Sequence, residues 1–175
     1  MNKNLNIKEI LELLRIYKNY ILELNNFEKK YNFKMRKPNF PEGLSENIIK
    51  EYINIVEKRK CININGGDLL IKNSNLKIEV KCFSSNGPTS FGPKENWNEL
   101  YFLDAIQFME NNFKIYKINL SNTDEKFKNI KINENKTYND ICIEGKRPRI
   151  VFNKLKKLLD NNIENIYNGD LFFYN

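Results

Sequence analysis

The chain has 175 residues, of which 41% are hydrophobic and 29% charged, a balance typical of folded rather than disordered proteins. This length is enough to bury a real core, and we expect residues 1–175 to form a single domain. The chain contains no histidine, which excludes the histidine-dependent nucleases of the ββα-metal and phospholipase-D types, Ser-His-Asp hydrolases and most zinc enzymes.

The formal net charge is +7, and it is concentrated in one segment. Residues 126–157 contain ten basic and three acidic side chains, so the rest of the chain sums to zero. A concentrated basic segment is typical of proteins that bind nucleic acid. The alternative is an ordinary solvated surface that is rich in lysine.

Cys61, Cys82 and Cys142 are too few and too widely spaced for a disulfide framework or a zinc knuckle, and they favour a reducing cytoplasm. No apolar run approaches the roughly 18 residues that a membrane span requires. The polar segment Met1–Glu9 lacks the apolar core of a signal peptide. We therefore expect a cytoplasmic protein with no membrane segment.

Two helices are expected first in chain order. Ile7–Phe27 has apolar residues at helical spacing, and such a face either forms a dimer contact or packs against a sheet. Ser45 is predicted to be the N-cap of a second helix, Glu46–Glu57. The first turn of this helix carries Glu46.

Asp68–Lys81 predicts a β-hairpin, because a short apolar run is followed by a polar turn and then by alternating apolar and polar residues. If Ile71 faces Leu76 across the turn, Asp68 lies directly opposite Glu79. Lys81 is two residues from Glu79 and projects from the same face of its strand. Two carboxylates and one ammonium then converge on one patch.

Such a patch can hold Mg²⁺, which binds through few protein oxygens together with water and substrate phosphate. The ion can activate a water and neutralise the charge that develops on a phosphodiester, while the lysine orients that water. The alternative is a salt bridge on a solvated hairpin. The pattern Glu-x-Lys also occurs at Glu28–Lys30, Glu134–Lys136 and Glu144–Lys146, but only Glu79–Lys81 lies in an alternating aliphatic strand.

The segment Ser84–Asn96 reads as a loop rich in glycine, proline and serine, and loops on a rigid scaffold often carry function. Its polar side chains can donate to phosphates or to base edges, unless the segment is an ordinary polar connection. The candidates for contact with nucleic acid are Ser84, Ser85, Asn86, Thr89, Ser90 and Lys94.

The C-terminal half predicts two further strands, Leu100–Ala105 and Phe113–Leu120. Leu120–Thr137 is polar and is expected to be irregular. Pro148–Leu159 reads as a basic amphipathic helix, and Leu171–Tyr174 is a possible edge strand.

Gly67-Asp68, ten intervening residues and Glu79-x-Lys81 resemble the PD-(D/E)XK nuclease motif, with glycine in place of the usual proline. Downstream, the TSFGP element Thr89–Pro93 before a hydrophobic strand is similar to small type II restriction endonucleases. Among these, the chain looks most like the Bsp-type enzymes that cut the interrupted site GCNGC. The resemblance covers about residues 40–120.

The resemblance implies an α/β fold with a restriction-endonuclease-like core, in which a central mixed β-sheet is flanked by helices. It also implies Mg²⁺-dependent hydrolysis of double-stranded DNA. Asp68 and Glu79 are then the metal ligands, with the Val80 carbonyl as a third. Lys81 positions or activates the attacking water. Many such nucleases carry an assisting glutamate on the helix before the hairpin, and Glu46 matches it better than Glu42 does, unless Glu46 merely complements the helix dipole.

The class further implies partners. A palindromic site has the two-fold symmetry of a homodimer, and a restriction enzyme acts beside a cognate DNA methyltransferase. In the basic segment, Lys146, Arg147 and Arg149 are the expected DNA contacts. Two alternatives remain: a catalytically silent DNA-binding protein of the same fold, and a repair or recombination nuclease of the same superfamily.

Overall fold

The computed structural model describes residues 4–64 and 68–171, and its centre is a six-stranded sheet. The strands lie in the order β1-β2-β3-β5-β6-β8. β3 and β5 are parallel, whereas the other neighbours are antiparallel, so the predicted mixed sheet is confirmed. These strands span Cys61–Asn63 (β1), Leu69–Ile71 (β2), Leu76–Phe83 (β3), Glu99–Asp104 (β5), Phe113–Ile118 (β6) and Ile163–Gly169 (β8).

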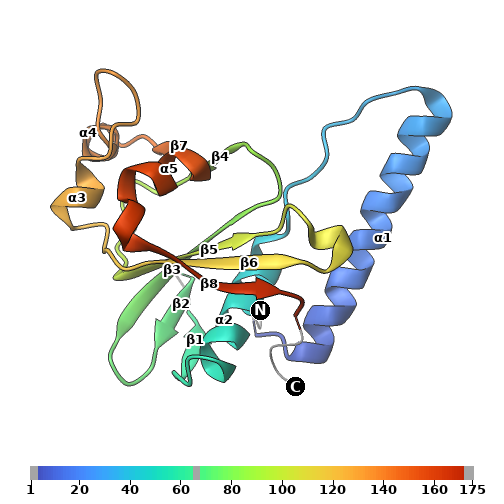
Figure 1. Cartoon of the computed structure of the whole chain (residues 1–175), viewed down its shortest axis with the longest axis horizontal. Helices are drawn as coiled ribbons and strands as arrows, with labels where there is room; N and C mark the ends of the chain where they lie inside the picture. Colours follow the sequence, from blue (N-terminus) through green and yellow to red (C-terminus); the bar gives the residue numbers. More distant parts are fainter. Residues whose placement is uncertain (1–3, 65–67, 172–175) are drawn as a thin grey trace.

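Helices cover both faces of this sheet, as predicted (Figure 1). One face carries α1 (Ile7–Tyr31) and α2 (Glu42–Ile55). The other carries α5 and a two-stranded sheet made by β4 and β7, with α3 and α4 beside them. These segments span Pro88–Ser90 (β4), Glu125–Lys128 (α3), Tyr138–Ile143 (α4), Arg149–Val151 (β7) and Phe152–Leu159 (α5), and short 3₁₀ turns occupy Phe108–Glu110 (η1) and Asp160–Asn162 (η2).

The two faces have separate hydrophobic clusters because side chains alternate along each strand. In β5, Tyr101 and Leu103 pack with the apolar sides of α1 and α2. Leu100 and Phe102 point the other way and pack with aromatic residues of α5 and its neighbours. The buried side of α1 therefore packs within the fold, which confirms the packing alternative for that side. No helix in the described part of the chain could cross a membrane.

The hairpin has the predicted register. Ile71 pairs with Leu76 and Leu69 pairs with Ile78 across the turn. Asp68 lies one residue before β2 and is therefore the next neighbour of Glu79. The register was predictable because a one-residue slip would turn every aliphatic side chain of β3 to the wrong face.

The second helix begins earlier than predicted. Its first residue is Glu42, after Pro41 in an extended conformation with φ −61° at the N-cap position. Ser45 is therefore not a cap but lies inside the first turns, where its hydroxyl donates to the Glu42 carbonyl over 2.8 Å. The helix also ends at Ile55, two residues before the predicted Glu57.

The basic C-terminal helix was predicted four residues too long at its start. Arg149–Val151 is β7, and α5 starts only at Phe152. The strand forms because Ile150 pairs with Thr89 of β4, whose hydroxyl donates to the Ile150 carbonyl over 3.1 Å. This contact joins distant segments, so helical periodicity could not anticipate it.

Three smaller expectations also changed. The expected loop Ser84–Asn96 contains β4, and the expected irregular segment Leu120–Thr137 contains α3. The two edges of the six-stranded sheet are β1 and β8. Of the predicted edge strand Leu171–Tyr174, only Leu171 is described, and it lies outside any strand, while residues 172–174 lie outside the described residues.

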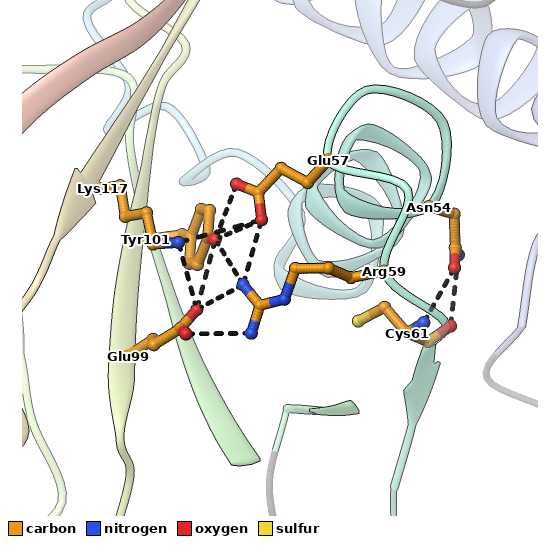
Figure 2. A network of polar contacts seen from close by, with 7 residues as sticks. All are labelled: Asn54, Glu57, Arg59, Cys61, Glu99, Tyr101 and Lys117. Carbon is orange, nitrogen blue, oxygen red and sulfur yellow. Dashed lines mark hydrogen bonds and ion pairs between the residues drawn. The ribbon is translucent and has the colours of Figure 1, made fainter. Parts of the chain in front are cut away.

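A polar cluster joins the end of α2 to the sheet (Figure 2). Arg59 donates to both carboxylate oxygens of Glu99, at 2.7 and 2.9 Å, and to Glu57 at 3.0 Å. The Tyr101 hydroxyl donates to Glu57 at 2.8 Å, and Lys117 lies 3.5 Å from Glu99. Every charge in this cluster has an opposite partner. We therefore regard it as a clamp that holds α2 on β5 and β6.

Candidate active site

Asp68, Glu79 and Lys81 converge at the hairpin. The Val80 N–H donates to Asp68 Oδ2 over 2.6 Å, which holds this carboxylate against β3 between the other two residues. Glu79 and Lys81 are paired in register with Leu100 and Phe102, so both project from the α5 side of the sheet. The Lys81 ammonium forms an ion pair with Glu79. The predicted trio is thus brought together, and Glu79 is only 5% exposed.

Burial dominates the electrostatics of this trio. It raises the pKa of Glu79 to about 8, although the Lys81 charge opposes the shift and the Asp68 charge adds to it. Burial also raises the pKa of Asp68, while the hydrogen bond from Val80 opposes that rise. Burial alone would lower the pKa of Lys81, but the neighbouring carboxylates, chiefly Glu79, raise it. The pair of carboxylates therefore needs positive charge nearby.

A cleft of about 660 Å³ opens beside the trio. Val80 and Lys81 line it from β3, and Arg147 and Arg149 line it from the segment that enters β7. Both arginines are exposed, whereas Pro148 and Ile150 between and beyond them are buried, as strand alternation requires. Four of the predicted loop residues also line the cleft: Ser84, Ser85, Thr89 and Ser90.

The remaining predicted DNA contacts lie elsewhere. Asn86 borders a small neighbouring pocket of about 70 Å³, which it shares with Ser85. Lys94 is exposed and is not among the residues that line the cleft. Lys146 is also outside the cleft lining and pairs with Glu144 over 2.9 Å. Lys94 and Lys146 therefore do not line the cleft in this structure.

The two candidate accessory acids occupy different environments on α2. Glu42 lines the cleft in the first turn, and its charge contributes to the raised pKa of Asp68. Glu46 is only 7% exposed and is not part of the cleft lining. The early start of the helix places Glu42 at the cleft. The sequence pattern favours Glu46 because it predicts the N-cap at Ser45.

Sequence reasoning missed three residues near the trio. Glu95 contacts both Lys81 and Arg147, each over 3.8 Å. Phe91 lies under the Lys81 ammonium, with 5.3 Å from Nζ to the ring centroid. Arg36 lines the cleft from the connection before α2. The predicted functional loop Ser84–Asn96 and its TSFGP element contain Phe91 and Glu95, but nothing local singled out Glu95 itself.

The oxygen donors at the trio suit Mg²⁺ better than a metal that needs a full protein cage. Within residues 4–64 and 68–171, no three acidic or cysteine side chains form a ready cage for a metal. Mg²⁺ does not require such a cage, since it is held by one or two carboxylates plus substrate phosphate and water. The buried Glu79 and the half-buried Asp68, both with raised pKa values, lie next to the Val80 peptide and an open cleft and fit that requirement.

Comparison with known proteins identifies the class. The chain is a type II restriction endonuclease, a hydrolase that cuts DNA at specific sequences. More narrowly, it belongs to the Bsp6I restriction endonuclease family, whose model matches residues 5–161. It is similar to the type II restriction enzyme Bsp6I of Bacillus sp. (strain RFL6), with 32% identity over 152 residues that cover 85% of this chain and 81% of that enzyme. No solved structure matches.

This result confirms the predicted family and reaction. It also sets aside both alternatives, the catalytically silent DNA-binding protein and the repair or recombination nuclease. The residues that the family model matches include the hairpin, the loop at the cleft and the segment that contains β7.

Proposed function

We propose that this enzyme hydrolyses double-stranded DNA with Mg²⁺ held by Asp68, Glu79 and the Val80 carbonyl, on a PD-(D/E)XK-type core. The observation that carries the proposal is the hydrogen bond of Asp68 to the strand that bears Glu79 and Lys81. It gathers two carboxylates and a lysine beside a cleft with exposed arginines. When bound, the metal activates a water and neutralises charge on the phosphodiester.

The protein groups divide the remaining work. Lys81 holds the attacking water in line and stabilises the negative charge that develops on the phosphate, because its ammonium lies at the carboxylate pair. Arg147 and Arg149 hold the DNA backbone in the cleft, with Ser84, Ser85 and Ser90 as hydrogen-bond donors. Thr89 supports the same wall through its bond to Ile150.

The accessory acid is Glu42 rather than Glu46 in this proposal. Glu42 lines the cleft and acts on the charge of Asp68, so it can orient a water or a second hydrated ion. Glu46 is the second candidate, because it lies one turn further along the same helix. Glu42→Gln should therefore slow cleavage more than Glu46→Gln does.

The proposal extends to the biological setting. The resemblance to Bsp-type enzymes supports the interrupted site GCNGC, which a homodimer matches by its two-fold symmetry. Three free cysteines support a reducing cytoplasm, where host DNA needs a cognate methyltransferase for protection.

The direct test is incubation of the purified chain with phage λ DNA. We expect discrete fragments in Mg²⁺ or Mn²⁺, binding without cutting in Ca²⁺, and no cutting in excess chelator. Glu79→Ala should lower the cleavage rate by about 10³-fold or more, since it removes a metal ligand. Glu144→Ala is the matched control: it breaks another Glu-x-Lys pattern on the exposed surface and should still cut. Full cleavage in chelator would sink the metal mechanism.

A further inference from the structure

Glu95 connects the catalytic trio to the DNA-binding wall of the cleft. Its Oε2 atom lies 3.8 Å from the Lys81 ammonium, and its Oε1 atom lies 3.8 Å from Nη2 of Arg147. The two cations come from β3 and from the segment that enters β7, so one carboxylate spans both elements. Its side chain is 33% exposed, which leaves room for such a shared role.

The loop around Glu95 fixes where this carboxylate lies. The Gly92 N–H donates to Glu95 Oε2 over 2.7 Å. The Asn122 side chain donates to the Glu95 carbonyl over 2.5 Å and accepts from Trp97 N–H over 3.2 Å. A Cβ at position 92 would lie only 2.2 Å from Glu95 Oε1, so the carboxylate folds over a place that only glycine leaves open. The contact is therefore built by the loop.

Lys81 is held from several sides at once. Its ammonium pairs with Glu79, contacts Glu95 and lies over the Phe91 ring. The proposed metal would use the two carboxylates of the trio, and among the contacts of the described residues Glu95 is then the carboxylate left to hold the lysine. Arg147 is 59% exposed and free to meet a phosphate, while its Nε atom donates to Ser90 Oγ over 3.1 Å.

We propose that Glu95 is a positioning residue that holds Lys81 for the reaction and makes its position depend on Arg147. The inference rests on the proposed function of Lys81. Arg147 holds the Oε1 atom of the Glu95 carboxylate, so that the Oε2 atom stays directed to the Lys81 ammonium. Loss of Arg147 then loosens the hold of Glu95 on the lysine.

The test uses Glu95→Gln, Gly92→Ala and a λ DNA fragment that carries one site mapped with the wild-type enzyme. Glu95→Gln removes the charge at constant size, and Gly92→Ala displaces the carboxylate without altering it. We expect each to lower the single-turnover rate at saturating enzyme by about 10–100-fold. Binding of the fragment in Ca²⁺ and the Mg²⁺ concentration for half-maximal rate should stay within about two-fold of wild type. Gly43→Ala, where a Cβ meets nothing within 4 Å, should cut like wild type.

The outcomes separate the two proposals. If the wild-type enzyme leaves λ DNA uncut in Mg²⁺, the proposed function fails. If wild type cuts and Glu95→Gln cuts equally fast, only the inference about Glu95 fails. A rate that excess Mg²⁺ restores would make Glu95 a metal ligand and overturn the positioning role.

A double-mutant cycle tests the dependence on Arg147. Arg147→Ala should lower the saturated single-turnover rate in the wild-type background, in addition to weakening binding. In the Glu95→Gln background the same substitution should cost no further rate, because the carboxylate that linked the two cations has lost its charge. Rate losses that simply add would overturn the link between Arg147 and Lys81.

Discussion

Glu79 lies where a carboxylate is hard to keep charged. It is almost fully buried, and burial raises its pKa to about 8, well above its ordinary value of 4.5. Between these two pH values the folded state binds more protons than the unfolded state. The free energy of unfolding therefore falls as the pH rises through this window. In the protein without metal, Glu79 is therefore a source of instability that grows with pH over this window.

Glu79→Gln should reveal this cost. In chelator, the melting temperature of the variant minus that of wild type should rise steadily from pH 5 to pH 9, since only wild type must deprotonate a buried carboxyl. Glu144→Gln is the control. The Lys136 and Lys146 partners lower the pKa of Glu144 to about 2, so its contribution is constant over this range. Thermal unfolding followed by circular dichroism gives both curves, and a difference that shrinks with pH would contradict the argument.

Individual site residues differ in how far the sequence could predict them. The trio could be found because Asp68, Glu79 and Lys81 belong to one hairpin, whose register follows from local alternation. Glu95 could not, because its carboxylate meets Arg147 only after β4 and β7 have paired across a long stretch of chain. The roles of all these residues stay predictions until variants are measured.

At the scale of elements, the clamp in Figure 2 is the main polar link between α2 and the sheet. Arg59 binds Glu99 through two hydrogen bonds and is also paired with Glu57. Burial would raise the pKa of Glu99, but Arg59 and Lys117 together lower it. The contribution of ionised Glu99 to stability is therefore present above pH 4.5 and is lost as the pH falls through the lower pKa that Glu99 has in the folded state.

Arg59→Met should destabilise the fold by about 2–4 kcal/mol at pH 7, because it leaves partly buried carboxylates short of a partner. Urea unfolding measures the loss, which should narrow below pH 4 as Glu99 becomes protonated. The paired variant Arg59→Met with Glu99→Gln should recover part of the stability, because the unpaired charge is gone. Lys117→Met should cost less, since Lys117 lies farther from both carboxylates. Equal stability of Arg59→Met and wild type at pH 7 would refute the clamp.

The elements themselves were predictable to the extent that their signals are local. The first helix, the hairpin and the strands β5 and β6 follow from periodicity over a few residues. The predicted start of α2 was wrong because serine is a favoured N-cap residue and Ser45 was assigned that role. The N-cap position is in fact held by Pro41. β7 was taken for helix because its pairing with β4 is a tertiary contact.

At the scale of the whole molecule, α1 has a second apolar stripe beside its buried one. Ile16, Tyr20, Phe27 and Tyr31 recur at spacings of four and seven residues and are 46–57% exposed. Such spacing places them on one side of the helix. Phe33, on the connection that follows, is 56% exposed. We propose this face as the contact with a second copy of the chain.

The exposed stripe on α1 leads to a prediction about the oligomeric state. The double variant Tyr20→Lys with Phe27→Lys should leave folding intact, because both side chains are exposed, but it should convert a dimer into a monomer in sedimentation velocity. A monomer has one active site, so nicked plasmid should accumulate before linear product appears. Ile143→Lys is the matched control, since it adds a lysine at a hydrophobic residue that is 77% exposed on α4. If the double variant and wild type have the same mass at every concentration, α1 is not the dimer contact, and the two active sites must be brought together by another surface.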